Sequence, residues 1–490
     1  PPATPPSPLA IKTNLKAAPF EKTDFRFPIN LATALRLADA RPLIVAAAQA
    51  RAWIAEAELA RAKVLWIPDL NIAADYIRHD GGGPDFNKGI LTAPSVNFFY
   101  AGGGLTGFIS TTDAIYQPLA ARQVLNAQHW NIQSAKNDAL LETADAYFMV
   151  HQYRGTYASG LYMVERAREV YNQVISLSSD LATPFEKDRA RNMLAELSQQ
   201  AVSARQGWRV QSARLTKVLR LDPRAVVEPL EHDHLQITLI DPSRTFDELM
   251  PIALDNRPEI AARRALVAAA EVKVRREKAR PFIPIAILNG FQSPGGMLIQ
   301  GGIFGLGPNS SLNQWFGRDD VSVQLIWQVE NFGIGNLARI KAQRGLESRA
   351  IVDLRNAQDM VAEEVNQAQA RLQSASARVS QADRALRTGI STLNGALEGL
   401  KHTSRFGDEL VLITRPQEAI YALELLKRAF DEYFGTVAEY NRAQFELFHA
   451  LGYPAREIAR FQPAGEVLPV NTARPAYLPP VGNGPPPATR

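Results

Sequence analysis

One stretch of the chain occurs twice, and this duplication limits the possible folds more than any other feature. The first copy runs from Asp39 to Pro68 and the second from Asp255 to Pro284. Each copy has an Arg-Pro pair near its start, continues through alanine-rich sequence and ends on an aromatic residue followed by Ile-Pro. The interval between the two prolines is the same in both copies, which indicates an internal duplication with an offset of about 216 residues. The sequence therefore predicts two versions of one structural unit.

The composition excludes several classes of function. The 54 lysines and arginines nearly balance the 50 aspartates and glutamates, for a net charge of +4, so we expect no nucleic-acid partner. There is no cysteine, which excludes disulfides, thiolate catalysis and cysteine metal sites. No Ser/His/Asp arrangement and no pair of carboxylates is placed by the sequence on a common site. We therefore expect neither catalysis nor a cofactor.

The hydropathy pattern limits how such a chain could cross a membrane. No apolar run reaches the roughly 18 residues that a membrane-spanning helix needs, because the longest candidates are interrupted by Pro284 or by Gly301 and Gly302. Any membrane-spanning segments would therefore be strands. The N-terminus lacks the basic start and apolar centre of a signal peptide. Both ends are rich in proline, so we expect extended, poorly packed tails at residues 1–28 and 455–490.

Helix and strand patterns follow the same order in each unit, with a linker at 226–245 between them. The first unit, 29–225, is expected to contain a helix that ends before Pro68, followed by two strands, a long helix and a return helix at about 69–78, 105–116, 118–178 and 184–221. The second unit, 246–454, is expected to contain a helix, two strands, a long helix and a return helix at about 258–282, 285–291, 320–330, 336–402 and 416–451.

Glycine clusters lie between the expected strands. They occur at Gly81–Gly83, at Gly102–Gly104 and from Gly290 to Gly317. Because they do not connect a strand to a helix, they do not fit a phosphate-binding loop. We interpret them as extracellular loops.

The second long helix carries an apolar seam. Its members recur in mostly alternating steps of three and four for more than five heptads, and every second position tends to be small, which lets neighbouring helices approach closely. The seam consists of Val361, Val365, Ala368, Leu372, Ala375, Val379, Ala382, Leu386, Gly389, Leu393, Ala396 and Leu400. We therefore expect this helix to form a coiled-coil packing with its neighbours.

The expected strands require more than one chain. Leu70, Ile72, Ala74 and Tyr76 alternate with more polar residues, and each strand has about the 9–11 residues that span a bilayer when tilted. Four strands are too few to close a barrel, and open strand edges are not tolerated in lipid. Several identical chains would therefore each contribute four strands to one shared barrel.

This order of elements resembles the bacterial outer-membrane efflux protein (TolC) family. The resemblance covers Leu31 to Pro454, and the motifs that carry it are the two Arg-Pro segments, the two Ile-Pro ends, Tyr116–Leu119 and Leu181–Glu186. It implies a mainly α-helical homotrimer with a twelve-stranded transmembrane β-barrel in the bacterial outer membrane. A periplasmic tunnel of twelve coiled-coil helices would continue the barrel and dock on an inner-membrane transporter through a periplasmic adaptor.

The resemblance also identifies candidate site residues. The turns between long and return helices carry acidic residues in the family that help close the tunnel, and Arg415 falls near a usual aspartate position, so a mixed charge pattern is expected here. The candidates for the gate or the adaptor contact are Ser178, Ser179, Asp180, Glu186, Gly407, Asp408, Glu409 and Arg415. At the other end, Pro68 and Pro284 are expected to mark the switch from helix to strand at the periplasmic surface of the barrel.

Two other motifs have simpler interpretations. His232-Asp233-His234 has the spacing of metal ligands, but it lies in the linker without a third ligand, so we interpret it as structural. A run of basic residues precedes the strands of the second unit and is interpreted as a solvated helix face, with contact to lipid headgroups as the alternative. It consists of Lys273, Arg275, Arg276, Lys278 and Arg280.

Two hypotheses of function follow from these observations. In the first, the protein is a channel that exports small molecules or polypeptides, in which the tube supplies a path and a gate and an energised partner supplies the work. In the second, the protein is a non-transporting, structural or scaffold tube in the outer membrane. A periplasmic adaptor is disfavoured, because adaptors do not need four strands of membrane-spanning length. The sequence identifies neither the exported substrate nor the pump.

Overall fold

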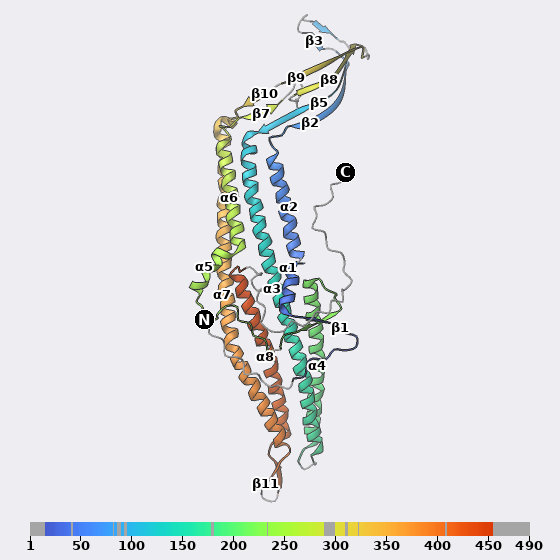
Figure 1. Ribbon diagram of the computed structural model, residues 1–490, viewed down its shortest axis with the longest axis vertical. Coiled ribbons are helices and arrows are strands. Elements are labelled where there is room, and N and C mark those ends of the chain that lie inside the picture. The colour runs from blue at the N-terminus through green and yellow to red at the C-terminus, as the bar shows by residue number, and fades with distance from the viewer. Residues whose placement is uncertain are drawn as a thin grey trace.

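The computed structural model describes residues 15–40, 43–81, 83–85, 90–92, 96–177, 181–232, 234–288, 299–308, 312–321, 323–406 and 409–453. The molecule is elongated, with most of its strands gathered at one end and long helices running to the other (Figure 1). The strand end and the helical tips are therefore separated by the full length of the protein.

Two helices of 66 residues set that length, α3 (Thr111–Ser176) and α7 (Ile334–Gly399). At about 1.5 Å per residue, each extends over roughly 100 Å. Each is followed by a return helix that packs against it in the half away from the strands, α4 (Pro184–Leu219) on α3 and α8 (Pro416–Ala450) on α7 (Figure 1). These two hairpins also contact each other through α3 and α8.

Shorter helices complete the half near the strands. α2 (Leu43–Lys63) packs on α3, while α6 (Pro258–Ala279) packs on both α3 and α7. α2 and α7 therefore lie at opposite margins of this helical layer, as Figure 1 shows. Two short helices, α1 (Leu31–Ala40) and α5 (Phe246–Asn256), precede α2 and α6.

The start expected for the first long helix, residue 118, is wrong. Pro118 lies inside α3 rather than ahead of it, and the helix begins seven residues earlier at Thr111. Proline removes one main-chain hydrogen bond from a helix interior. Thr112 and Ala114 are buried in this first segment, and we attribute the persistence of the helix to that packing.

The strands near α2 and α6 form one antiparallel sheet with four strand positions. They are β2 (Asp69–His79), β5 (Val96–Ser110), β7 with β8 (Ile285–Leu288 and Ile299–Pro308), and β10 with β9 (Val323–Ile326 and Gln314–Val321). β7 and β8 pair with successive parts of β5, and β10 and β9 pair with β7 and β8 in turn, so each couple occupies a single position. A small hairpin, β3 (Gly83–Asp85) with β4 (Ile90–Thr92), lies beyond them.

Two of the expected glycine-rich loops are wrong. Gly102–Gly104 lie inside β5, and the segment expected to be a loop up to Gly317 contains β8 and the start of β9. Glycine is used here to make room for aromatic rings: a Cβ on Gly302 would lie 2.6 Å from the Tyr100 ring and 2.7 Å from the Ala101 carbonyl oxygen. The strand expected at 105–116 accordingly begins at Val96 and ends at Ser110.

The expected poorly packed N-terminal tail is wrong for residues 15–28, and the start of the linker lies in a strand. β1 (Phe25–Ile29) pairs in parallel with β6 (Ala225–Pro229), beside the middle of the helices (Figure 1). Ala18 is buried. The Phe20 ring packs edge-on against the buried Trp208 of α4, with 5.1 Å between the ring centroids. The apolar side chains between the prolines therefore decide that this segment packs against the helices, although its proline content is typical of a poorly packed tail. The tail expected at 455–490 lies outside the described residues.

The helical core confirms the apolar seam of α7. Ten of its twelve positions are buried, and the remaining two, Val379 and Ala396, are partly buried. In the half near the tips, Leu386 and Leu393 pack in a cluster with Leu426 and Phe430 of α8. Gly389 approaches α8 so closely that an added Cβ would lie 3.4 Å from the Leu426 Cα. This packing holds α7 and α8 together along their shared length.

Candidate functional site

The sheet presents a largely apolar face. Directly opposite residues of antiparallel strands point to the same side, and the register places Tyr76, Phe99, Gly305 and Trp315 in one row across all four positions. The centroids of the Phe99 and Trp315 rings are 5.6 Å apart. A Cβ on Gly305 would lie 3.0 Å from the Trp315 ring. Along β2 the same face exposes Leu70 and Ile72, the latter 84% exposed.

The two outer edges of the sheet are available for further pairing. Within the described part of the chain, β2 pairs only with β5, and the position formed by β9 and β10 pairs only with β8 and β7. β2 has 11 residues, which suffices for a tilted strand to cross a bilayer. None of the described helices is both long and apolar enough to span a membrane.

The two prolines of the duplicated motif occupy equivalent places. Pro68 directly precedes β2 and Pro284 directly precedes β7, each after a short turn that follows a helix. Trp66 and Phe282, two residues before the respective prolines, are exposed. The location fits the expected helix-to-strand switch, and the effect of either proline on membrane insertion stays a prediction.

The basic run beside this junction is only partly a solvated face. Arg276 and Arg280 are partly buried and lie 3.5 and 3.1 Å from Asp113 at the start of α3. Both also bind the buried carboxylate of Glu277, at 2.8 and 2.9 Å. Arg275 is exposed, as expected. The interpretation is therefore wrong for two of the five residues, because an acidic partner on another helix draws them inward and ties α6 to α3 below the strands.

The turn between α3 and α4 is short and capped by side chains. The Thr183 Oγ1 accepts from the Glu186 main-chain N–H at 3.3 Å, and the Glu186 carboxylate accepts from the Thr183 main-chain N–H at 2.9 Å. This reciprocal pair is a capping box. Glu186 therefore has a local structural partner, and its role in a gate stays a prediction. Ser178, Ser179 and Asp180 lie outside the described residues.

The turn between α7 and α8 is built differently. β11 (Thr403–Phe406) and β12 (Glu409–Leu412) form a four-pair antiparallel hairpin, in which Glu409 pairs with Phe406. The hairpin extends beyond the ends of the long helices (Figure 1). Gly407 and Asp408 lie outside the described residues. Arg415 is the N-cap residue of α8, and its side chain makes no capping hydrogen bond. The helices predicted at 336–402 and 416–451 left this connection without strands, and that is wrong for β11 and β12.

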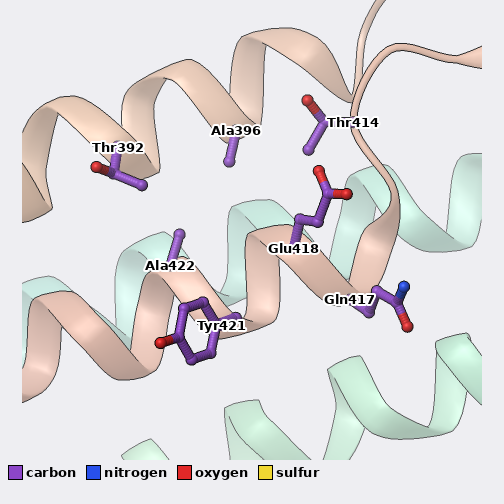
Figure 2. Close-up of a pocket in the computed structure, with 7 residues that line it drawn as sticks. All are labelled: Thr392, Ala396, Thr414, Gln417, Glu418, Tyr421 and Ala422. Atoms are coloured by element: carbon purple, nitrogen blue, oxygen red, sulfur yellow. The ribbon is translucent and has the colours of Figure 1, made fainter.

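A surface groove of about 570 Å³ lies beside this hairpin, between α7 and α8. Figure 2 shows Thr392 and Ala396 of α7 facing Glu418 and Ala422 of α8, with Thr414 at the connection. Tyr421 of α8 also lines the groove and is 65% exposed. A wide, mixed polar and apolar surface of this kind suits contact with another protein more than enclosure of a small molecule.

The histidine pair of the linker region has a structural contact. His234 Nδ1 lies 3.0 Å from the Tyr433 hydroxyl of α8. Burial raises the pKa of Tyr433 to about 12, so the hydroxyl stays protonated, and it donates to or accepts from Nδ1 according to the His234 tautomer. Asp233 lies outside the described residues, and within the described ranges no three His, Asp or Glu side chains are grouped to hold a metal ion.

Solved structures share this fold at low sequence identity. The outer membrane protein VceC of Vibrio cholerae is 15% identical, with a TM-score of 0.66 over 86% of this chain and 96% of its own. The outer membrane channel CmeC of Campylobacter jejuni is 14% identical, with a TM-score of 0.67 over 86% of this chain and 85% of its own. The open state of the outer membrane channel MtrE of Neisseria gonorrhoeae is 14% identical, with a TM-score of 0.65 over 86% and 89%.

Comparisons with protein-family models and with curated proteins found no match. The structural likeness confirms the mainly helical part of the expected fold: the chain shares its fold with these outer-membrane proteins. At this level of identity the likeness establishes the fold, and function has to be argued from the site itself.

Proposed function

We propose that this chain is one subunit of a homotrimeric outer-membrane channel that exports small molecules or polypeptides from the periplasm or from a docked inner-membrane pump and adaptor. The observation that carries the proposal is the four-position sheet with two open edges, attached to helices that extend roughly 100 Å away from it. The fold shared with outer-membrane channels supports it.

The edges of the sheet support a shared barrel. Open strand edges are not tolerated in lipid, so β2 of one copy would pair with the β9/β10 position of the next. Three copies would then supply twelve strands. The exposed apolar residues of β2 would face lipid, and the row of Tyr76, Phe99 and Trp315 would lie at a membrane interface, where aromatic residues are favoured.

The margins of the helical layer support the same closure. Trp53 and Ile54 are exposed on α2, and Leu337, Val352 and Met360 are exposed on α7 at the opposite margin. Apolar side chains at both margins suit packing between neighbouring copies in a ring. Four helices per copy in this half, α2, α3, α6 and α7, would make a tunnel of twelve.

The two helical turns would then lie together at the periplasmic end of the tunnel. We propose that they form the gate and the surface that meets the adaptor. The groove between α7 and α8 supports a contact there because it is open, and because Tyr421 offers an exposed aromatic side chain of the kind enriched at protein interfaces.

Cross-linking between copies tests the shared barrel. The chain has no cysteine, so an Ile77→Cys, Gln314→Cys variant carries thiols only on the two edge strands, in one row of the sheet. Reaction of the detergent-solubilised variant with a flexible bis-maleimide should give species of up to three chains on a denaturing gel. The Ile77→Cys variant alone is the matched control and should yield no species of three chains. A double variant that remains monomeric would refute the barrel.

A further inference from the structure

The end of α8 meets the start of α6 at a joint remote from both the strands and the tips. Gly452, just beyond α8, has a φ of +70° and lies against the main chain of the α5–α6 connection. A Cβ on Gly452 would lie 2.7 Å from the Arg257 nitrogen, so both the backbone conformation and the close approach require glycine. The contact places the last turn of α8 beside the Arg257 side chain.

Arg257, the arginine of the second Arg-Pro motif, is the centre of this joint. Its side chain is 5% exposed and connects three helices. Nη1 donates to the His449 carbonyl oxygen of α8 at 3.1 Å, Nη2 binds Glu364 of α7, and Nε lies 3.3 Å from Glu259 of α6. Because two carboxylates hold the guanidinium, it has little freedom to move away from a change beside it.

The His449 ring lies between Arg257 and an acidic residue of α3. Its Nδ1 is 3.3 Å from Arg257 Nη1, and its Nε2 is 2.8 Å from Asp138 Oδ1. Arginine has only donors, so Nδ1 must be unprotonated to accept, and Nε2 must carry the proton that Asp138 accepts. The geometry thus matches the neutral imidazole with its proton on Nε2.

We propose that Arg257, His449 and Asp138 form a pH-sensitive latch, in which acid releases the end of α8 from α6 while leaving it attached to α3. Protonation of His449 places an N–H and a positive charge on Nδ1, directly against the Arg257 guanidinium. The same protonation adds a charge that Asp138 attracts. The charged groups on Arg257 are Glu259 and Glu364, and those around an adjacent cavity are Asp138, Glu142, Asp145, Arg442 and Glu446.

Hydrogen exchange of the full-length, detergent-solubilised protein at pH 7.5 and 5.5 tests the latch. After correction for intrinsic exchange rates, protection of main-chain amides at 256–261 and 447–452 should fall severalfold at the lower pH. In His449→Gln the side-chain amide supplies one acceptor and one donor, and its charge does not change with pH. The loss of amide protection at pH 5.5 should therefore disappear in this variant. His402→Gln changes an exposed histidine near the tip. This variant is the matched control and should still lose protection at pH 5.5.

A second variant separates the latch from a purely structural role. Asp138→Asn removes the negative charge that faces Nε2 of the ring, so the midpoint of the exchange transition should move toward acid. The latch is refuted if wild-type protection is equal at the two pH values, if His449→Gln keeps the wild-type response, or if Asp138→Asn leaves the midpoint unchanged.

Discussion

The two turns that reverse the chain at the helical tips are held by different chemistry. The end of a helix leaves main-chain groups without intrahelical partners. At the α3–α4 turn, the side chains of Thr183 and Glu186 satisfy two of these groups. At the α7–α8 turn, the main chain pairs with itself in the β11–β12 hairpin, and the Ile413 N–H donates to the His402 carbonyl oxygen.

This difference has consequences for how each turn can be disrupted. The first turn depends on two side chains and should respond to single substitutions there. The second depends on main-chain pairing and on close packing at its base, so its N-cap side chain should matter little. In the proposed channel, the longer second turn would also project furthest toward a partner (Figure 1).

Removal of the hairpin should have the largest effect. Replacement of residues 404–411 by two glycines shortens the second turn to the scale of the first. If the hairpins help close the tunnel, the conductance of the variant in planar lipid bilayers should rise severalfold while its mass in detergent stays that of the wild type. An unchanged conductance would show that the hairpin has no part in closure.

Crowding the base of the second turn should have the next largest effect. A Cβ on Gly399 would lie 2.0 Å from Thr414 Oγ1 and 2.9 Å from Thr414 Cβ. Gly399→Ala should therefore destabilise the turn by about 1–3 kcal/mol, measured by local hydrogen exchange. Gly395→Ala is the matched control on the same helix, because its Cβ would meet no atom within 4 Å, and it should instead stabilise by about 0.5–1 kcal/mol.

The capping residues give the sharpest contrast between the turns. Thr183→Ala removes a capping hydrogen bond and should cost about 1 kcal/mol, seen as faster amide exchange in the first turn of α4. Arg415→Ala removes the N-cap side chain of α8, which makes no such bond, and should change stability by less than about 0.5 kcal/mol. Equal losses at the two positions would contradict the comparison.

The smallest effect concerns pH at the base of the second turn. Hydrogen bonds from Lys401 and His402 lower the pKa of Glu398. A carboxyl group whose pKa is lowered on folding stabilises the fold above its unfolded-state pKa, and this contribution is lost as the pH falls through the folded-state pKa. Glu398→Gln should therefore lower the melting temperature slightly at pH 7, and the difference should shrink as the pH falls below the ordinary glutamate pKa of about 4.3. A difference that stays constant as the pH falls would have another cause.

Long-range periodicity made much of the helical fold predictable from the sequence. The seam of α7 could be predicted because burial recurs with the heptad along a continuous helix, and the return helices begin at Pro184 and Pro416 as proline at a first helical position indicates. The glycines of β5 and β8 led to the wrong prediction of loops. Their role depends on contact with rings such as that of Tyr100, which lie next to them only in the folded protein.

The candidate site was less predictable than the fold. The inward turn of Arg276 and Arg280 depends on Asp113, which is distant in sequence. The sequence signal for the second-turn hairpin was the Gly-Asp pair at 407–408 between short strands, which is typical of a two-residue hairpin connection. The gate and adaptor roles of the turn residues stay predictions, because they depend on neighbouring copies and partners.

Conductance of the purified, full-length protein in planar lipid bilayers tests the central claim most directly. We expect discrete conductance steps from an assembly of three chains, with larger steps after removal of the β11–β12 hairpin. A protein that inserts as a trimer but passes no ions, both with and without the hairpin, would contradict the channel and leave the non-transporting tube as the better description.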